Sequence, residues 1–402
     1  MKEYVYRAGL LVEKHELARK GTTWNESEVQ EDPWTLRPVR RITTVGLYNT
    51  TPTYHTRSAW TDDGERLVFA SGRYGKSAVL SCHVATGAIS QLTDAVDGAG
   101  VGDGVGGICV APKSGWVLYH YGGAMRAVHI DTLEERVLLS HGTLGSPTID
   151  ANEEYLIWGT NNQSLPEYWL DPDNAVFRML RLPLAGGNVE VVYREEGVQG
   201  THLQYSPTDP DLLLLTRDTP RWRYPTRGIT NRMWTYRLST GKLTELAPRN
   251  PAHLEMHATW SWDGRSVLYH GPATKSGWHI GDSEVQQGVG WYVGVVSPDG
   301  QVLWEHEGPS WTAYGHVSAM AGRPAIILDG NVSSELLTLM YYDGSLPRIE
   351  IIGRHGTNWG GHTGQLSHPH PQSDPTGRWI SFNAAGGGRS DVYVVDVSDL
   401  GS

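Results

Sequence analysis

The segment Trp60-Thr-Asp-Asp-Gly64-Glu-Arg-Leu-Val-Phe69 contains the pattern from which the fold can be predicted. An aromatic residue precedes a turn built from Asp and Gly, and an apolar segment begins directly after this turn. Two further copies cover Trp262–Tyr269 and Asp374–Phe382, with turn glycines at Gly264 and Gly377. Short apolar segments separated by such turns are typical of antiparallel strands. The stretch therefore predicts a strand–turn–strand unit that recurs along the chain.

Looser copies of this unit fill the intervals, so that it recurs about every fifty residues, within the range typical of repeat architectures. These copies cover Ala111–Tyr119, Asp150–Trp158, Ser206–Leu215 and Met320–Leu328. Most copies are followed by another strand, a Thr-Gly turn and a fourth strand. Three clear and four looser copies of a four-stranded unit predict an all-β fold, namely a seven-bladed β-propeller.

The N-terminal part of the chain can supply the strand that the last repeat unit lacks. The last unit ends after its third strand, Asp391–Asp396, whereas Val39–Val45 resembles the outer-strand segment Ala88–Thr93. We therefore expect an N-terminal strand to close the last blade, which removes the open edges of the sheets. Residues 1–34 would then form an N-terminal arm, and residues 35–402 the propeller domain.

Composition and charge limit which binding partners and which cellular location we expect for the protein. With 33 Lys+Arg against 44 Asp+Glu, the net charge of −11 argues against a nucleic-acid partner. The apolar run Ala8–Val12 is too short to span a membrane and is followed by no clear cleavage site. Two cysteines require no disulfide framework. We therefore expect a cytoplasmic protein without a membrane partner.

The placement of the histidines points to chemistry. His257 and His370 each lie seven residues before the turn glycine of their unit, and His316 lies six residues before Gly322. Similar positions ahead of their own turns are occupied by His55, His202 and His368. Because the first strand of each blade lines the central channel, these imidazoles are expected to converge at one mouth of that channel.

The densest group of polar ligands is Gln365-Leu-Ser-His368-Pro-His370. In an extended segment, residues two apart point to the same side, so His368 and His370 can bind one ion. With His316 and Gln365 they form the candidate metal site. Imidazole nitrogens and an amide oxygen suit a divalent ion such as Mn²⁺, Zn²⁺ or Fe²⁺.

These residues resemble the oligogalacturonate lyases, which are metal-dependent seven-bladed propellers acting on pectin fragments. The resemblance runs from Val39 to Val395 and is most specific in His355–Trp359 and Gln365–Pro371. In the family, the latter region supplies a Gln and two His ligands, and a further His comes from the preceding blade. The resemblance therefore implies a site for Mn²⁺ or a similar ion at Gln365, His368, His370 and His316.

Two other segments resemble the family's active site. Glu255–Trp260 matches the segment whose histidine is the proposed base, which implies that role for His257. Asn231–Trp234 matches the segment with an active-site arginine, here Arg232. The residues Ala258-Thr259 depart from the acidic and aromatic pair of the family, which leaves the sugar of the substrate open.

The chemistry of β-elimination fits these residue types. On a 4-linked uronate it removes the proton at C5 and expels the oxygen at C4, which leaves a 4,5-unsaturated uronate. A divalent ion can neutralise the carboxylate, Arg232 offers a permanently charged fork, and neutral His257 can accept the proton. Further residues expected to bind the anionic oligosaccharide are His202, His55, Arg221 and Arg227.

Other functions are compatible with the same sequence. A lyase of the same mechanism could act on a glucuronate- or iduronate-containing oligosaccharide. A non-catalytic propeller could serve as a binding module, and a metal-dependent hydrolase or isomerase could use the same ligands. The sequence leaves open the exo or endo mode, the chain length, the native metal, the oligomeric state and whether another channel histidine is the base.

Overall fold

The computed structural model describes residues 4–7, 10–13, 17, 19–52, 59–98, 104–140, 145–161, 175–218, 231–273, 290–308, 315–330, 335–357 and 368–400. Within these ranges the regular elements are strands, β1 to β33. No helix in this part of the chain is long and apolar enough to cross a membrane.

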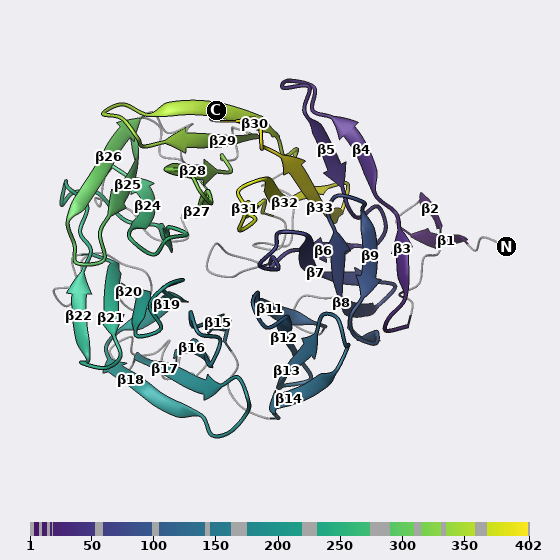
Figure 1. Cartoon of the computed structure of the whole chain (residues 1–402), viewed down its shortest axis with the longest axis horizontal. Helices are drawn as coiled ribbons and strands as arrows, with labels where there is room; N and C mark the ends of the chain where they lie inside the picture. Colours follow the sequence, from purple (N-terminus) through teal and green to yellow (C-terminus); the bar gives the residue numbers. More distant parts are fainter. Residues whose placement is uncertain are drawn as a thin grey trace.

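Five separate antiparallel sheets of four strands each follow one another along the chain. In each sheet, consecutive strands are neighbours. Figure 1 shows the sheets arranged around a centre, with first strands such as β15 and β19 on the inside and fourth strands such as β18 and β22 on the outside.

The bounds of these five sheets are as follows. The first two sheets contain β11 (Gly106–Ala111), β12 (Trp116–Tyr121), β13 (Ala124–His129) and β14 (Glu135–Leu139), then β15 (Thr148–Ile149), β16 (Tyr155–Asn161), β17 (Val176–Pro183) and β18 (Glu190–Glu196). The third contains β19 (Gln199–Tyr205), β20 (Leu212–Asp218), β21 (Met233–Arg237) and β22 (Lys242–Glu245). The last two contain β23 (His257–Trp260), β24 (Val267–Pro272), β25 (Trp291–Val296) and β26 (Val302–Gly308), then β27 (Val317–Ala319), β28 (Ala325–Leu328), β29 (Leu336–Tyr341) and β30 (Arg348–Arg354).

An eleven-stranded sheet completes the ring. It holds two meanders, β6-β7-β8-β9 and β31-β32-β33-β5, which are joined by a single parallel pair between Tyr48 and Ser390. Its strands are β3 (Thr23–Asn25), β4 (Glu28–Glu31), β5 (Pro38–Arg41), β6 (Tyr48–Thr50), β7 (Arg66–Arg73), β8 (Lys76–His83), β9 (Ala88–Gln91), β10 (Val96–Asp97), β31 (Gln372–Ser373), β32 (Trp379–Gly386) and β33 (Arg389–Asp396).

The all-β propeller predicted from the sequence is confirmed, and so is the closing strand. That strand is β5, which pairs with β33 through Val39 opposite Val395 and ends at Arg41, earlier than predicted. The predicted seven blades do not form seven separate sheets. The Tyr48–Ser390 pair merges the first and last meanders, which leaves five separate sheets and one large one.

The N-terminal arm lies along the outer edges of the large sheet. Its strand β3 pairs with β9, and β4 pairs with β5. A separate hairpin of β1 (Tyr4–Arg7) and β2 (Leu10–Glu13) projects from the ring near the N-terminus in Figure 1. These pairings attach the arm predicted over residues 1–34 to the propeller, while the domain boundary itself stays a prediction.

The turn glycines of the repeat hold neighbouring units together. Gly64, Gly264 and Gly377 have φ values of 68°, 67° and 71°, which favour glycine. A Cβ on Gly264 would overlap Thr208 in the turn of the preceding sheet, and one on Gly377 would overlap Ala321. The repeated glycine therefore permits both the turn and the close approach of adjacent turns around the ring.

Candidate metal centre

The innermost strands bring the predicted histidines to one end of the channel. His257 begins β23, whereas His316 and His370 lie just before β27 and β31. The ring centroids of His257 and His316 are 4.9 Å apart, and those of His202 and His257 are 5.4 Å apart. A shared position in the repeat therefore becomes a shared place in the fold.

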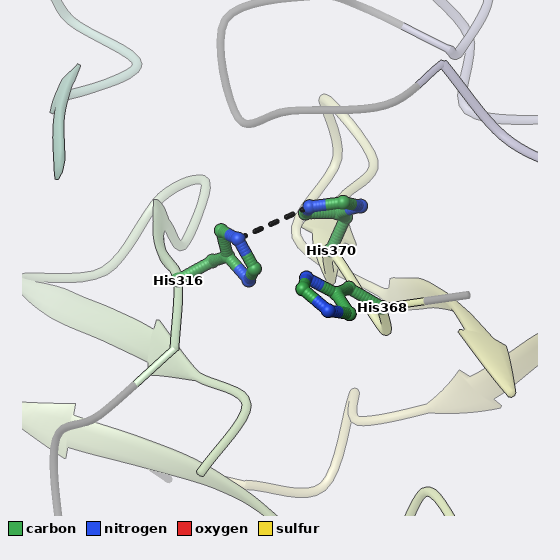
Figure 2. A group of neighbouring side chains, drawn as sticks. All are labelled: His316, His368 and His370. Atoms are coloured by element: carbon green, nitrogen blue, oxygen red, sulfur yellow. Dashed lines mark hydrogen bonds between the residues drawn. The ribbon is translucent and has the colours of Figure 1, made fainter. Parts of the chain in front are cut away.

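Three of these histidines form a cluster that could hold a metal ion. One ring nitrogen from each of His316, His368 and His370 lies within 4.8 Å of the others. The Nε2 atoms of His316 and His370 are 3.2 Å apart, and Figure 2 shows both rings turned towards each other with His368 beside them. Two nitrogens that each lie about 2.1 Å from one ion would be roughly 3.0–3.4 Å apart. The spacing therefore fits a shared ion.

Asp329 orients one of the three rings. Its Oδ2 lies 2.9 Å from Nδ1 of His316, and its Oδ1 accepts the backbone N–H of His316 at 2.6 Å. The carboxylate is fully buried. A carboxylate on the far nitrogen of a metal-binding histidine fixes the ring orientation and raises its basicity. Asp329 thus leaves Nε2 of His316 facing the cluster.

Backbone conformation and burial also prepare the histidines. His202 and His370 have φ values of 49° and 41°, in the left-handed region that non-glycine residues seldom adopt. Burial and the nearby charge of His316 lower the pKa of His368 to about 4. Burial, with the charges of Arg232 and His316, lowers the pKa of His202 to about 3. Both imidazoles are therefore neutral near pH 7 and can use a nitrogen lone pair.

His257 has two close partners at one nitrogen. Its Nδ1 lies 2.9 Å from the carbonyl oxygen of Gly315 and 3.0 Å from Nε2 of His270. Trp291 donates its indole N–H to Nδ1 of His270 at 3.0 Å. This bond leaves the proton of neutral His270 on Nε2, where it faces Nδ1 of His257. Only the tautomer of His257 that is protonated at Nδ1 and donates to the carbonyl of Gly315 leaves Nε2 able to accept a proton.

Arg232 is buried beside the entry to β23. Its Nη1 donates to the carbonyl oxygens of Glu255 and Met256 at 2.7 and 2.6 Å. The guanidinium therefore fixes the chain immediately before His257. Its predicted contact with substrate stays a prediction.

Two residues that support the site, His270 and Asp329, were not predicted from the sequence, although the sequence contains a signal for both. His270 lies directly opposite His257 in the β23–β24 register. Val317 lies opposite Leu328 in the β27–β28 register, and the next positions beyond this pair are His316 and Asp329. Pairing each predicted histidine across its turn would have identified both partners.

Four predicted site residues lie outside the described residues. They are His55, Arg221, Arg227 and Gln365. Their assignments as substrate-binding residues and, for Gln365, as a metal ligand stay predictions.

Comparison with known proteins adds a fold-level result. No protein-family model and no curated protein sequence matches this chain. Among solved structures, an oligogalacturonate lyase in complex with manganese is 19% identical, with a TM-score of 0.74 over 94% of this chain and 98% of its own. An oligogalacturonate lyase from Vibrio parahaemolyticus is 18% identical, with a TM-score of 0.74 over 94% and 99%.

A hydrazine synthase from Kuenenia stuttgartiensis is also similar in fold. It is 12% identical, with a TM-score of 0.52 over 87% of this chain and 97% of its own. Since one architecture can host unrelated chemistry, likeness at such identities shows the fold alone. The expected resemblance to the oligogalacturonate lyases is thus confirmed at the level of the β-propeller fold.

Proposed function

We propose that this protein is a polysaccharide lyase that cleaves 4-linked uronate oligosaccharides, such as oligogalacturonate, by metal-assisted β-elimination. The cluster of His316, His368 and His370 beside His257 is the observation that carries the proposal. It brings candidate ligands for a divalent ion close to an imidazole that can act as a base, the two functions that this elimination requires.

The residues present fit a divalent ion. Three imidazoles, one of them oriented by buried Asp329, form the described part of the site, and Gln365 is the proposed fourth ligand. We propose Mn²⁺ because the similar oligogalacturonate lyase structure is a manganese complex, and Zn²⁺ and Fe²⁺, which imidazole ligands suit, are the alternatives. When bound, the ion would neutralise the uronate carboxylate and so ease loss of the adjacent proton.

The side chains of the chain itself perform the proton transfer. In the tautomer that is protonated at Nδ1 and donates to Gly315, His257 accepts the C5 proton at Nε2. The electron pair of the C5–H bond forms the double bond between C4 and C5, the bond from C4 to the glycosidic oxygen breaks, and that oxygen takes a proton from solvent. Arg232 contributes positive charge beside His257 and holds the chain that carries it.

The substrate class follows from the chemistry of the site. A uronate carboxylate suits a divalent ion and a buried arginine, and Arg221 and Arg227 are proposed to hold the anionic oligosaccharide. A glucuronate- or iduronate-containing oligosaccharide is the alternative substrate. A non-catalytic binding module would leave the convergence of these histidines and Asp329 without a purpose.

The ring has seven blades in this proposal, because each meander of the eleven-stranded sheet counts as one blade. Seven apolar clusters support this count. One cluster joins β7 and β8 to β33 across the Tyr48–Ser390 pair, through Phe69, Leu80 and Val392. The merged meanders are thus packed against each other like the separate sheets.

Ultraviolet absorbance of the unsaturated product tests the function. Protein loaded with Mn²⁺ is incubated with oligogalacturonate, glucuronate- and iduronate-containing oligosaccharides, with and without chelator. We expect absorbance to rise with oligogalacturonate and chelator to abolish the rise. A rise only with another uronate would keep the mechanism and change the substrate.

Two histidine variants test whether the activity depends on His257 in particular. His257→Ala should reduce kcat by about 10²–10⁴, the usual contribution of general base catalysis. His83→Ala, on β8 and partly exposed, is the matched control and should leave the rate unchanged. No absorbance with any uronate would overturn the lyase proposal.

A further inference from the structure

A second cavity lies at the other end of the innermost strands. It has a volume of about 360 Å³ and is lined by residues that include Trp60, Asp150, Tyr205, Trp260 and Trp262. Trp260 is the last residue of β23, whereas His257 is the first. With a rise of about 3.3 Å per residue, the cavity lies roughly 10 Å along the strand from the histidines.

The same polarity holds in the neighbouring sheets. His316 precedes β27 and Ala319, at its end, lines the cavity. His370 precedes β31, and both residues of this strand line the cavity. The cavity includes none of the clustered histidines. It is therefore a separate opening of the channel.

Two buried polar groups on its wall have unused hydrogen-bonding capacity. The indole Nε1 of Trp260 is buried and has no hydrogen-bond partner among the described residues, and this side chain is 6% exposed. Asp150, which is 4% exposed, uses Oδ1 for the backbone N–H groups of Glu154 and Tyr155. Its Oδ2 accepts no hydrogen bond from that part of the chain. Burial raises the pKa of this carboxyl.

A ligand that matches these two groups both donates and accepts hydrogen bonds. The indole N–H needs an acceptor, and the carboxylate oxygen needs a donor. A hydroxyl group can serve either role. Of the three tryptophans on the wall, Trp262 is 36% exposed and offers apolar ring surface to the C–H face of a sugar ring, whereas Trp60 and Trp260 are buried.

The charge of the wall selects against an anion. Among the described residues, Asp62, Asp150 and Glu153 line the cavity together with one cation, Lys113. Lys113 is engaged with the carbonyl oxygen of Ala151 at 2.8 Å, so it does not offset all three carboxylates. A uronate would therefore be repelled here, whereas a neutral sugar would not.

We infer that this cavity is a second binding site, which takes a neutral saccharide of one or two rings through Trp260 and Asp150. Its volume lies in the range of small-ligand pockets, about 300–1,000 Å³. The site does not depend on the proposed lyase activity, because it uses none of the residues assigned to that reaction.

Calorimetric titration of the Mn²⁺-loaded protein tests the inference. The probes are methyl galactoside, methyl xyloside, lactose and cellobiose, with galacturonate as the anionic comparison. At least one neutral probe should bind, and galacturonate should not compete with it. Trp260→Phe and Asp150→Asn should each weaken this binding about tenfold through one lost hydrogen bond.

Control variants separate the two mouths of the channel. Trp304→Phe removes an indole N–H that donates to Gly344 away from the cavity, and it should leave neutral-saccharide binding unchanged. His316→Ala should also leave it unchanged. The inference is overturned if no neutral probe binds, if binding survives both cavity substitutions, or if His316→Ala abolishes it. None of these outcomes bears on the proposed lyase activity, because the absorbance assay with the wild-type protein tests that activity separately.

Discussion

At the scale of single residues, the orientation of one imidazole decides how well the histidine cluster can bind an ion. Asp329 accepts from both the backbone and Nδ1 of His316. Without this carboxylate, the ring of His316 could rotate or carry its proton on the wrong nitrogen. The metal affinity should therefore depend on a residue that does not touch the ion.

Replacing Asp329 tests this dependence. Asp329→Asn should weaken Mn²⁺ binding about 10–100-fold, because the amide retains one acceptor but no longer favours the correct tautomer. Calorimetric titration with Mn²⁺ measures the effect. Asp343→Asn, at an exposed position in the same sheet, is the control. Equal affinities in the two variants would show that Asp329 does not position the ligand.

The pH dependence of stability tests the burial of His202. Its folded-state pKa of about 3 lies below the ordinary value of about 6.5, so the unfolded chain takes up this proton first as the pH falls. The contribution of neutral, buried His202 to the free energy of unfolding is fully present above about pH 6.5. It is lost progressively as the pH falls to about 3. His202→Asn should therefore gain stability relative to wild type between pH 7 and pH 5.

Urea unfolding of the metal-free proteins at the two pH values measures that gain. Asn tolerates the left-handed backbone of position 202, so any gain from relieved strain would be present at both pH values. Only the difference between pH 7 and pH 5 reports the titration. An identical pH dependence in variant and wild type would contradict it.

At the scale of elements, a buried ion pair attaches the N-terminal arm to the first meander. Glu26 receives both guanidinium nitrogens of Arg73 at 2.9 Å, the indole N–H of Trp24 and the backbone N–H of Thr44. Burial alone would raise the pKa of Glu26, but the charge of Arg73 and these hydrogen bonds lower it. The arm is thereby held against β7.

Glu26→Gln should destabilise the protein by about 3–5 kcal/mol, because it leaves the buried Arg73 charge without its counterion. The exposed pair of Lys76 and Asp97 in the same sheet is the control, and Asp97→Asn should cost no more than about 1 kcal/mol. Urea unfolding measures both. Similar losses would mean that burial does not strengthen the first pair.

Strands of the repeat could be predicted from sequence, whereas those of the arm could not. Five of the seven repeat units have a turn glycine beside the strands that pair across it, as Gly264 does between β23 and β24. In contrast, β4 is exposed at all four positions and shows no alternation. It becomes a strand because β5 offers it an edge, which local sequence does not reveal.

In the candidate site, too, some residues could be predicted from the sequence and others could not. Histidines six or seven residues before a turn glycine, such as His257, His316 and His370, could be placed at one mouth of the channel. His270 and Asp329 were missed because they lie on the second strand of their units and are recognised only by cross-strand pairing. The second cavity depends on side chains from many units, such as Trp60 and Asp150, whose sequence context resembles ordinary turns.

At the scale of the whole molecule, the ring closes through β5. Val39 is buried among apolar side chains from the last meander and its neighbour, including Ile380 and Val395. Val39→Asp should destabilise the protein by more than about 3 kcal/mol, because it buries a charge without a partner at the closure. Thermal and urea unfolding measure this loss.

Val29→Asp is the matched control on the adjacent strand β4. Val29 is 55% exposed, so this change should alter stability by no more than about 0.5 kcal/mol. If Val39→Asp were equally mild, the closing strand would contribute little to the integrity of the ring.

The mass of the products formed from oligogalacturonate in water labelled with heavy oxygen distinguishes elimination from hydrolysis. Elimination by the Mn²⁺-loaded protein should give an unsaturated fragment that is one water lighter than a hydrolysis product and carries no label. Chelation of the metal should prevent its formation. Products that carry the heavy oxygen, or an uncleaved substrate, would contradict the assignment of this propeller as a metal-assisted lyase.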